Sequence, residues 1–160
     1  MKGVLLDTSF FVRLLNTDDP LHENAKQYYK YFLEHEIELK ISTISIAEFC
    51  TRGSLSDLPL KDLKILPFNI DHAVKAGEFA HTVHQNKTND KIDISPRVII
   101  PNDTKLFSQA ETDLTIDAYI SSDTRSYRIY SILKKECNVN FEFMDMNIAC
   151  SAKFGILPFE

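Results

Sequence analysis

One stretch decides the fold of this chain: residues 3–16, Gly-Val-Leu-Leu-Asp-Thr-Ser-Phe-Phe-Val-Arg-Leu-Leu-Asn. A short apolar run at residues 4–6 ends directly in Asp7, and the apolar residues that follow recur at helical spacing. This pattern is typical of a buried strand that ends in a carboxylate and leads into a helix capped by the hydroxyl of Thr8 or Ser9. Ligands bind just outside the carboxyl ends of the strands in an open parallel sheet. Asp7 is therefore expected at a binding edge.

The composition is that of a globular protein with a sizeable core. The chain has 160 residues, of which 44% are hydrophobic and 26% charged, so residues 1–160 are expected to form one domain. Eleven Phe and six Tyr supply large apolar groups. There are only four Gly and no GxGxxG or GxxxxGK[ST] pattern, which argues against a glycine-rich phosphate loop.

Charge and cysteine content narrow the class of protein further. The formal net charge of −5 argues against long-range attraction to nucleic acid. It leaves room for a metal-dependent enzyme, because bound cations change the local sign of a site. The three cysteines form no CxxC pair, which disfavours a disulfide framework or structural zinc site. With a strand expected from residue 3 and no apolar run near 18 residues, we expect a soluble cytoplasmic protein without signal peptide or membrane span.

Strand-like and helix-like segments alternate along the chain. Strands are predicted at about 3–7, 39–43, 63–67, 116–121 and 140–144. Helices are predicted between them, at about 20–36, 46–50, 71–84, 101–110 and 127–133, with a short one near 147–153 and a polar loop at 85–97. This order favours an α/β fold, a three-layer α/β/α sandwich with a central, mainly parallel five-stranded sheet. Pro67 places the third strand at the sheet edge.

Two other features have ordinary structural interpretations. The aromatic residues at 28–31 recur on one face of the second helix, where they either pack on the sheet or offer a stacking surface for bases. Packing is the favoured interpretation, because such stripes belong to the core more often. His81 and His84 lie outside an HExxH frame and are interpreted as surface residues rather than metal ligands.

Four acids stand out by their positions. Asp7 and Asp123 end the first and fourth predicted strands, and Glu48 and Asp103 are expected in the first turns of helices, where a favourable helix dipole alone would suit them. Strand ends and the following helix starts lie on the same side of a parallel sheet, so all four can converge. Four unpaired carboxylates would repel one another. Mg²⁺ or Mn²⁺ would resolve this repulsion, because these hard cations prefer carboxylate oxygens and leave positions for water and phosphate.

With these four acids in place, the chain resembles the PIN-domain family. The resemblance is carried by residues Val4–Ser9, Ser42–Phe49, Pro101–Ala110 and Ala118–Asp123, which are similar to the four acidic motifs of that family in the same order. The nearest relatives would be the small single-domain type, including the VapC-type toxins of toxin–antitoxin pairs.

The resemblance implies a nuclease fold and an Mg²⁺- or Mn²⁺-dependent endoribonuclease, a hydrolase that cleaves RNA phosphodiester bonds. The metal would lower the pKa of a bound water, and the water would attack phosphorus in line. The resemblance also implies two candidate partners, an antitoxin protein and a second copy of the chain. The acids that it implies as catalytic residues and metal ligands are Asp7, Glu48, Asp103 and Asp123. The supporting hydroxyl residues are Thr8 or Ser9, orienting Asp7 or a metal-bound water, and Ser121.

The chain departs from the family pattern near its fourth motif. Many relatives carry a further Asp shortly after that motif, whereas Asp123 is followed here by Thr-Arg-Ser, which puts a second metal position in doubt. Thr104 also stands where Ala usually follows the third acid. Arg125 and Arg128 are candidates for phosphate binding, and they are equally well explained as ordinary charges on a helix surface.

Two other functions remain open from the sequence. One is a catalytically silent PIN-like module that binds RNA or a protein, which the retention of all four acids disfavours. The other is a haloacid-dehalogenase-like phosphatase, which also opens with a strand and an Asp. That family uses a second Asp two positions on, where this chain has Ser9, so this alternative is the weaker one.

Overall fold

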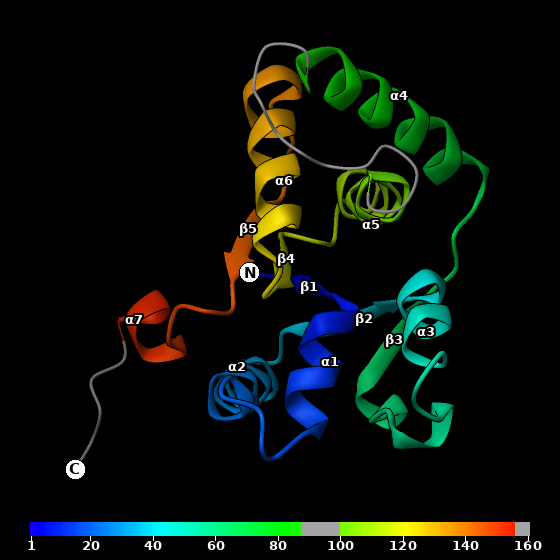
Figure 1. Cartoon of the computed structure of the whole chain (residues 1–160). Helices are drawn as coiled ribbons and strands as arrows, with labels where there is room; N and C mark the ends of the chain where they lie inside the picture. Colours follow the sequence, from blue (N-terminus) through cyan, green and yellow to red (C-terminus); the bar gives the residue numbers. More distant parts are fainter. Residues whose placement is uncertain (88–99, 156–160) are drawn as a thin grey trace.

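The central element is a parallel β-sheet whose five strands lie in the order β3-β2-β1-β4-β5 (Figure 1). The computed structural model describes residues 1–87 and 100–155. Every pair of neighbouring strands in the sheet is parallel, which confirms the predicted α/β fold, and β3 forms an edge as Pro67 indicated. The strands are β1 (Gly3–Leu6), β2 (Glu38–Ser42), β3 (Leu63–Leu66), β4 (Ala118–Ser121) and β5 (Glu142–Asp145).

Helices cover both faces of this sheet and complete the three layers (Figure 1). On one side α1 packs against α2 and α3, and α2 packs against α7; on the other, α4, α5 and α6 pack against one another. The helices are α1 (Thr8–Leu15), α2 (His22–Glu34), α3 (Thr43–Phe49), α4 (Ile70–Lys87), α5 (Ile100–Thr112), α6 (Thr124–Cys137) and α7 (Cys150–Phe154). Two single 3₁₀ turns, Leu55–Asp57 and Leu60–Asp62, connect α3 to β3.

Alternation along the strands divides the core in two. Val4 and Leu6 of β1 join the cluster beneath α1 and α2, whereas Leu5 joins the cluster beneath α4, α5 and α6. Tyr28 and Phe32 of α2 are fully buried in the first cluster. The aromatic stripe therefore belongs to the core, as the favoured interpretation held, and His81 and His84 are exposed as expected.

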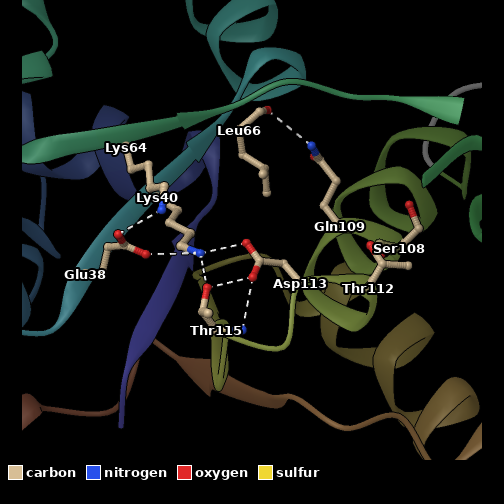
Figure 2. Close-up of polar contacts among 9 residues, drawn as sticks. All are labelled: Glu38, Lys40, Lys64, Leu66, Ser108, Gln109, Thr112, Asp113 and Thr115. Carbon is tan, nitrogen blue, oxygen red and sulfur yellow. Dashed lines mark hydrogen bonds and ion pairs between the residues drawn. The ribbon is translucent and has the colours of Figure 1, made fainter. Parts of the chain in front are cut away.

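Lys40 is a fully buried lysine in the middle of β2 (Figure 2). Its Nζ lies 2.6 Å from Asp113 Oδ2 and 3.1 Å from Glu38 Oε2, and it also donates to the hydroxyl of Thr115. Glu38 is bonded in turn to Lys64 on β3, at 3.1 Å. A buried charge is tolerated only when it is paired and hydrogen-bonded, and this cluster meets both conditions near the amino ends of the strands.

Several predicted boundaries were wrong by one turn or less. Helix α2 begins at His22 instead of Pro20, and α7 is displaced to Cys150–Phe154. Helix α4 continues through Lys87, past the predicted loop start at 85; the remainder of that predicted loop lies outside the described residues. The side-chain cap of α4 is Asn69, whose Oδ1 accepts from the His72 N–H at 3.0 Å, and the predicted cap Asp71 lies in the first turn.

The start of α6 also differs from the prediction: it begins at Thr124, directly after Asp123, three residues before the expected start at 127. No helix in the described ranges is long and apolar enough to cross a membrane.

Candidate active site

All four predicted acids line one pocket of about 250 Å³ beyond the carboxyl ends of β1 and β4. The acids come from four separate places in the chain. Asp7 follows β1, Glu48 lies on α3, Asp103 lies on α5, and Asp123 lies between β4 and α6. The other residues that line the pocket are Thr8, Ser9, Asn102 and Leu106.

Asp7 is held at the junction between β1 and α1 by two serine hydroxyls. Its Oδ2 accepts hydrogen bonds from Ser9 Oγ at 2.7 Å and from Ser121 Oγ at 2.8 Å. The same oxygen accepts from the Ser9 backbone N–H, so Asp7 itself is the N-cap of α1. The prediction of a hydroxyl cap was wrong, because the strand ends at Leu6 and leaves Asp7 in the extended conformation that an N-cap residue adopts.

Glu48 enters the pocket from the last turn of its helix. Helix α3 begins at Thr43 and is capped by Ser42, whose Oγ accepts from the Ile44 N–H at 3.0 Å. The predicted cap, Ser45, is instead buried inside the helix, and Glu48 is not in the first turn as expected. The dipole therefore gives no reason for an acid at this position.

Two side chains hold the carboxylate of Glu48. Thr8 Oγ1 donates to Oε2 at 2.5 Å, and Asn102 Nδ2 donates to Oε1 at 2.6 Å. Of the two hydroxyls proposed to orient Asp7, Ser9 does so and Thr8 orients Glu48 instead. Hydrogen bonds from both sides fix the direction of this carboxylate before any ligand binds.

Asp103 lies in the first turn of α5, as predicted, and its side chain is half-buried. Its Oδ2 is buried and has no hydrogen-bond partner among the described residues. Burial raises the pKa of Asp103 to about 7, and the nearby negative charges of Asp7, Asp123 and Glu48 add to this effect, while the Ser126 hydroxyl opposes it. A carboxylate oxygen buried without a donor is a position that a cation would complete.

Asp123 caps α6 and is connected to Asp7 through Ser121. Its Oδ1 accepts from the Arg125 N–H at 2.8 Å, and its own N–H donates to Ser121 Oγ at 3.1 Å. Ser121 is fully buried and also contacts Ser9 Oγ at 3.2 Å. Each of the three hydroxyl residues predicted to support the acids therefore contacts at least one acid of the pocket. Ser121 contacts two, Asp7 and Asp123.

The structure adds Asn102 to the site and leaves the two arginines outside it. Asn102 immediately precedes Asp103, and its place in the third motif was the only signal that could have identified it. Arg125 and Arg128 are exposed on α6, and neither lines the acidic pocket. Arg128 instead lines a different hollow along α6, together with Tyr127.

The donor set fits a hard divalent cation. The pocket offers carboxylate oxygens and the Asn102 amide, which suit Mg²⁺ or Mn²⁺, and the buried Asp103 Oδ2 has no other partner. Within the described ranges, no three His, Cys, Asp or Glu side chains lie close enough together to hold a metal ion between them. This arrangement is compatible with Mg²⁺, which commonly uses one or two carboxylates and keeps several waters.

Comparison with solved structures identifies relatives of the whole fold. The chain is similar to the DNA-bound VapBC of Salmonella typhimurium, with a TM-score of 0.56 and 14% identity over 91% of this chain and 99% of that one. It is also similar to VapBC2 of Rickettsia felis bound to a promoter DNA fragment, with a TM-score of 0.58 and 16% identity over 89% and 97% of the two chains. A third similar structure is Mycobacterium tuberculosis VapC20, described as a Sarcin-Ricin loop cleaving toxin, with a TM-score of 0.55 and 17% identity over 79% and 94%.

The family assignment comes from a comparison at the level of sequence. No match was found among curated proteins. The model of the PIN domain family matches residues 4–132, a range that contains all four acids of the pocket. The match covers most of the chain and confirms the resemblance seen in its motifs: this protein belongs to the PIN domain family.

Proposed function

We propose that this protein is an endoribonuclease that hydrolyses RNA phosphodiester bonds with Mg²⁺ or Mn²⁺ held by Asp7, Glu48, Asp103 and Asp123. The observation that carries the proposal is the convergence of these acids, from four segments, on one pocket. Phosphoryl chemistry at a pocket without Lys or Arg requires another source of positive charge, and a divalent cation supplies it.

The solved structures to which this chain is similar support this proposal. VapC20, whose fold is similar, is described as a toxin that cleaves the Sarcin-Ricin loop, and the two other similar structures are VapBC complexes. We extend the proposal to the toxin of a toxin–antitoxin pair, with an antitoxin protein that covers the acidic pocket and with a homodimer as the functional form.

In this mechanism the pocket residues hold and orient, and the cation supplies charge. A bound Mg²⁺ or Mn²⁺ would lower the pKa of a water and offset the charge of the phosphate. Ser9 and Ser121 fix Asp7, and Thr8 and Asn102 fix Glu48, so two acids are oriented before binding. This preorganisation reduces the entropy lost on reaching the reactive geometry.

The exposed arginines of α6 have a separate proposed role. Arg125 and Arg128 lie on α6, shortly after its cap Asp123, but outside the pocket, so we assign them to flanking phosphates of the RNA rather than to the cleaved one. Such contacts position a nucleic acid without reading its sequence.

The test is a cleavage assay on the full chain. Labelled RNA is incubated with the purified protein in Mg²⁺, in Mn²⁺ and in EDTA, and the Asp7→Asn variant is assayed beside the wild type. Cleavage should require a divalent cation and fall to background in Asp7→Asn. The matched control is Asp18→Asn, because Asp18 is an exposed acid outside the pocket, and it should cleave like the wild type.

Each contrary result has a distinct meaning. Cleavage that persists both in EDTA and in Asp7→Asn would refute the metal-dependent mechanism. RNA binding without cleavage in either metal would favour the catalytically silent module, the alternative that the four ordered acids disfavour.

A further inference from the structure

A second hollow of about 290 Å³ adjoins the acidic pocket. It lies between α1 and the turn that follows α3. Thr8 and Glu48 line both cavities, and the hydrogen bond between them at 2.5 Å forms part of the shared wall. The two hollows are thus neighbouring compartments on one surface, and we call the second one the side groove.

One wall of the side groove is apolar and consists of solvent-exposed side chains of α1. Val12 and Leu15 lie one turn apart on α1, are 48% and 42% exposed, and both line the side groove. The opposite wall is Phe49 of α3, backed by Gly53, whose N–H donates to the Phe49 carbonyl at 2.9 Å. A Cβ at position 53 would lie 2.7 Å from the Phe49 ring, so a larger residue there would displace the ring that forms this wall.

The rim of the side groove carries one cation, the guanidinium of Arg52. Thr51 and Arg52 lie on the turn that leaves α3, and both are exposed. Arg52 forms no ion pair with any described residue, although the chain carries a net charge of −5. An unpaired guanidinium beside an apolar slot is suited to a ligand with a flat ring and a negative group.

We propose that the side groove binds one nucleobase of the RNA next to the cleaved phosphate, with Arg52 on the phosphate that follows it. The inference rests on the proposed ribonuclease function. Single-stranded RNA is recognised largely by bases splayed out against aromatic and apolar side chains, and by cations on its phosphates. The volume of about 290 Å³ lies slightly below the range of drug-sized ligand sites, roughly 300–1,000 Å³, so it suits one ring system better than a protein helix.

The side groove also has the right place for this role. A strand whose phosphate reaches the four acids can continue past Thr8 and Glu48 into the side groove, because these two residues are the common border of the two hollows. The occupant next to the cleavage site is therefore the adjoining nucleotide, and the groove would give the enzyme a base preference at one position.

The experiment measures RNA binding in the Asp7→Asn background, where cleavage is removed and the side groove is intact. The probe is a fluorescent RNA oligonucleotide that the wild type cleaves, together with derivatives that carry a single abasic site at each position in turn. Affinities are measured by anisotropy. We expect one abasic position, adjacent to the cleaved bond, to weaken binding by about fivefold or more, the range for loss of one stacked base.

Three added variants assign that effect to the side groove. Leu15→Gln should abolish the difference between the abasic and intact RNA at that position without changing the net charge. Leu33→Gln is the matched control, because Leu33 is 43% exposed on α2 and does not line the groove, and it should keep the difference. Arg52→Gln should weaken every RNA by a similar factor and leave the base preference in place.

The outcomes separate the two proposals. If the wild type cleaves RNA but no abasic position stands out, or if Leu15→Gln keeps the same profile, the nucleobase site is refuted and the ribonuclease function stands. A groove that serves a protein partner instead would give this result. If the wild type neither cleaves nor binds RNA, both proposals fail.

Discussion

At the scale of single residues, ionisation of the half-buried Asp103 lowers the stability of the folded protein. Its folded-state pKa of about 7 lies above the ordinary value for an aspartate, about 3.9, so folding favours the protonated form. The cost of this group is absent below about pH 4, grows as the pH rises, and is complete above about pH 7. Without a cation, the contribution of Asp103 to stability is therefore least favourable above about pH 7, where its carboxylate is ionised.

Asp103→Asn should consequently stabilise the metal-free protein, and more at pH 8 than at pH 5. The neutral amide keeps the shape of the side chain and cannot ionise. Melting temperatures in EDTA, followed by circular dichroism, should rise by a few degrees at pH 8, and this gain should shrink at pH 5. The exposed control Asp18→Asn should show no such dependence, and an equal shift of Asp103→Asn at both pH values would contradict the electrostatic origin.

Residue positions could be predicted from the sequence more reliably than residue partnerships. The acids were found because each stands at the end of an apolar run or beside a predicted helix start. The division of labour between Thr8 and Ser9 was not predictable, because it depends on which way neighbouring side chains point after α1 and α3 pack together. Asn102 was missed for the same reason. Its amide belongs to the site because it donates a hydrogen bond to Glu48, which lies 54 positions earlier in the chain.

At the scale of elements, helix α3 shows how the residue that caps a helix determines where a later side chain, here Glu48, is placed. The prediction started this helix at Ile46, whereas the structure starts it at Thr43 after the cap Ser42. The polar sequence Ser-Thr-Ile-Ser offers several hydroxyls, and the apolar pattern alone does not choose among them. The end of β2 decides which hydroxyl caps the helix, because the strand runs only as far as Ser42.

Ser42→Ala should therefore loosen α3 and reduce activity together. Loss of an N-cap hydroxyl costs about 1 kcal/mol, and here the frayed helix carries Glu48. Denaturant unfolding would measure the stability, and RNA cleavage the activity.

The matched variant is Ser54→Ala, which removes the cap of the 3₁₀ turn Leu55–Asp57 outside the pocket. It should lose stability without a comparable loss of cleavage. If both variants retain full activity, the cap of α3 has no part in placing Glu48.

At the scale of the whole molecule, the charged groups gather at opposite ends of the sheet. The acidic pocket lies at the carboxyl ends of the strands, and the cluster around Lys40 lies toward their amino ends (Figure 2). Hydrogen bonds from Lys40 and Lys64 hold the pKa of Glu38 below its usual value. Burial by itself would raise the pKa of Asp113, but the hydrogen bonds from Lys40 and Thr115 outweigh it and the net pKa is lowered.

The Lys40 cluster should make stability sensitive to acid. Since the pKa values of Glu38 and Asp113 are lowered by folding, their contribution is complete above about pH 4 and is lost as the pH falls through the lower folded values. Urea unfolding of the wild type and Lys40→Met should therefore differ more at pH 6 than at pH 3. Lys30→Met is the control, because its pair with Glu34 is exposed, and it should change little at either pH. A gap of constant size across this range would show that the lysine contributes only packing.

The distribution of the four acids along the chain also sets the moment at which the pocket comes into existence. A ribosome delivers Asp7 and Glu48 with β1, β2 and β3, which are neighbours in the sheet and able to associate early. Asp103 and Asp123 arrive only later, with α5 and the end of β4, and β4 must then add to the open side of β1. While residues 49–102 are being added, a growing chain therefore carries only two of the four acids. The complete acidic pocket therefore exists only after β4 has joined the sheet and brought Asp123 beside Asp7.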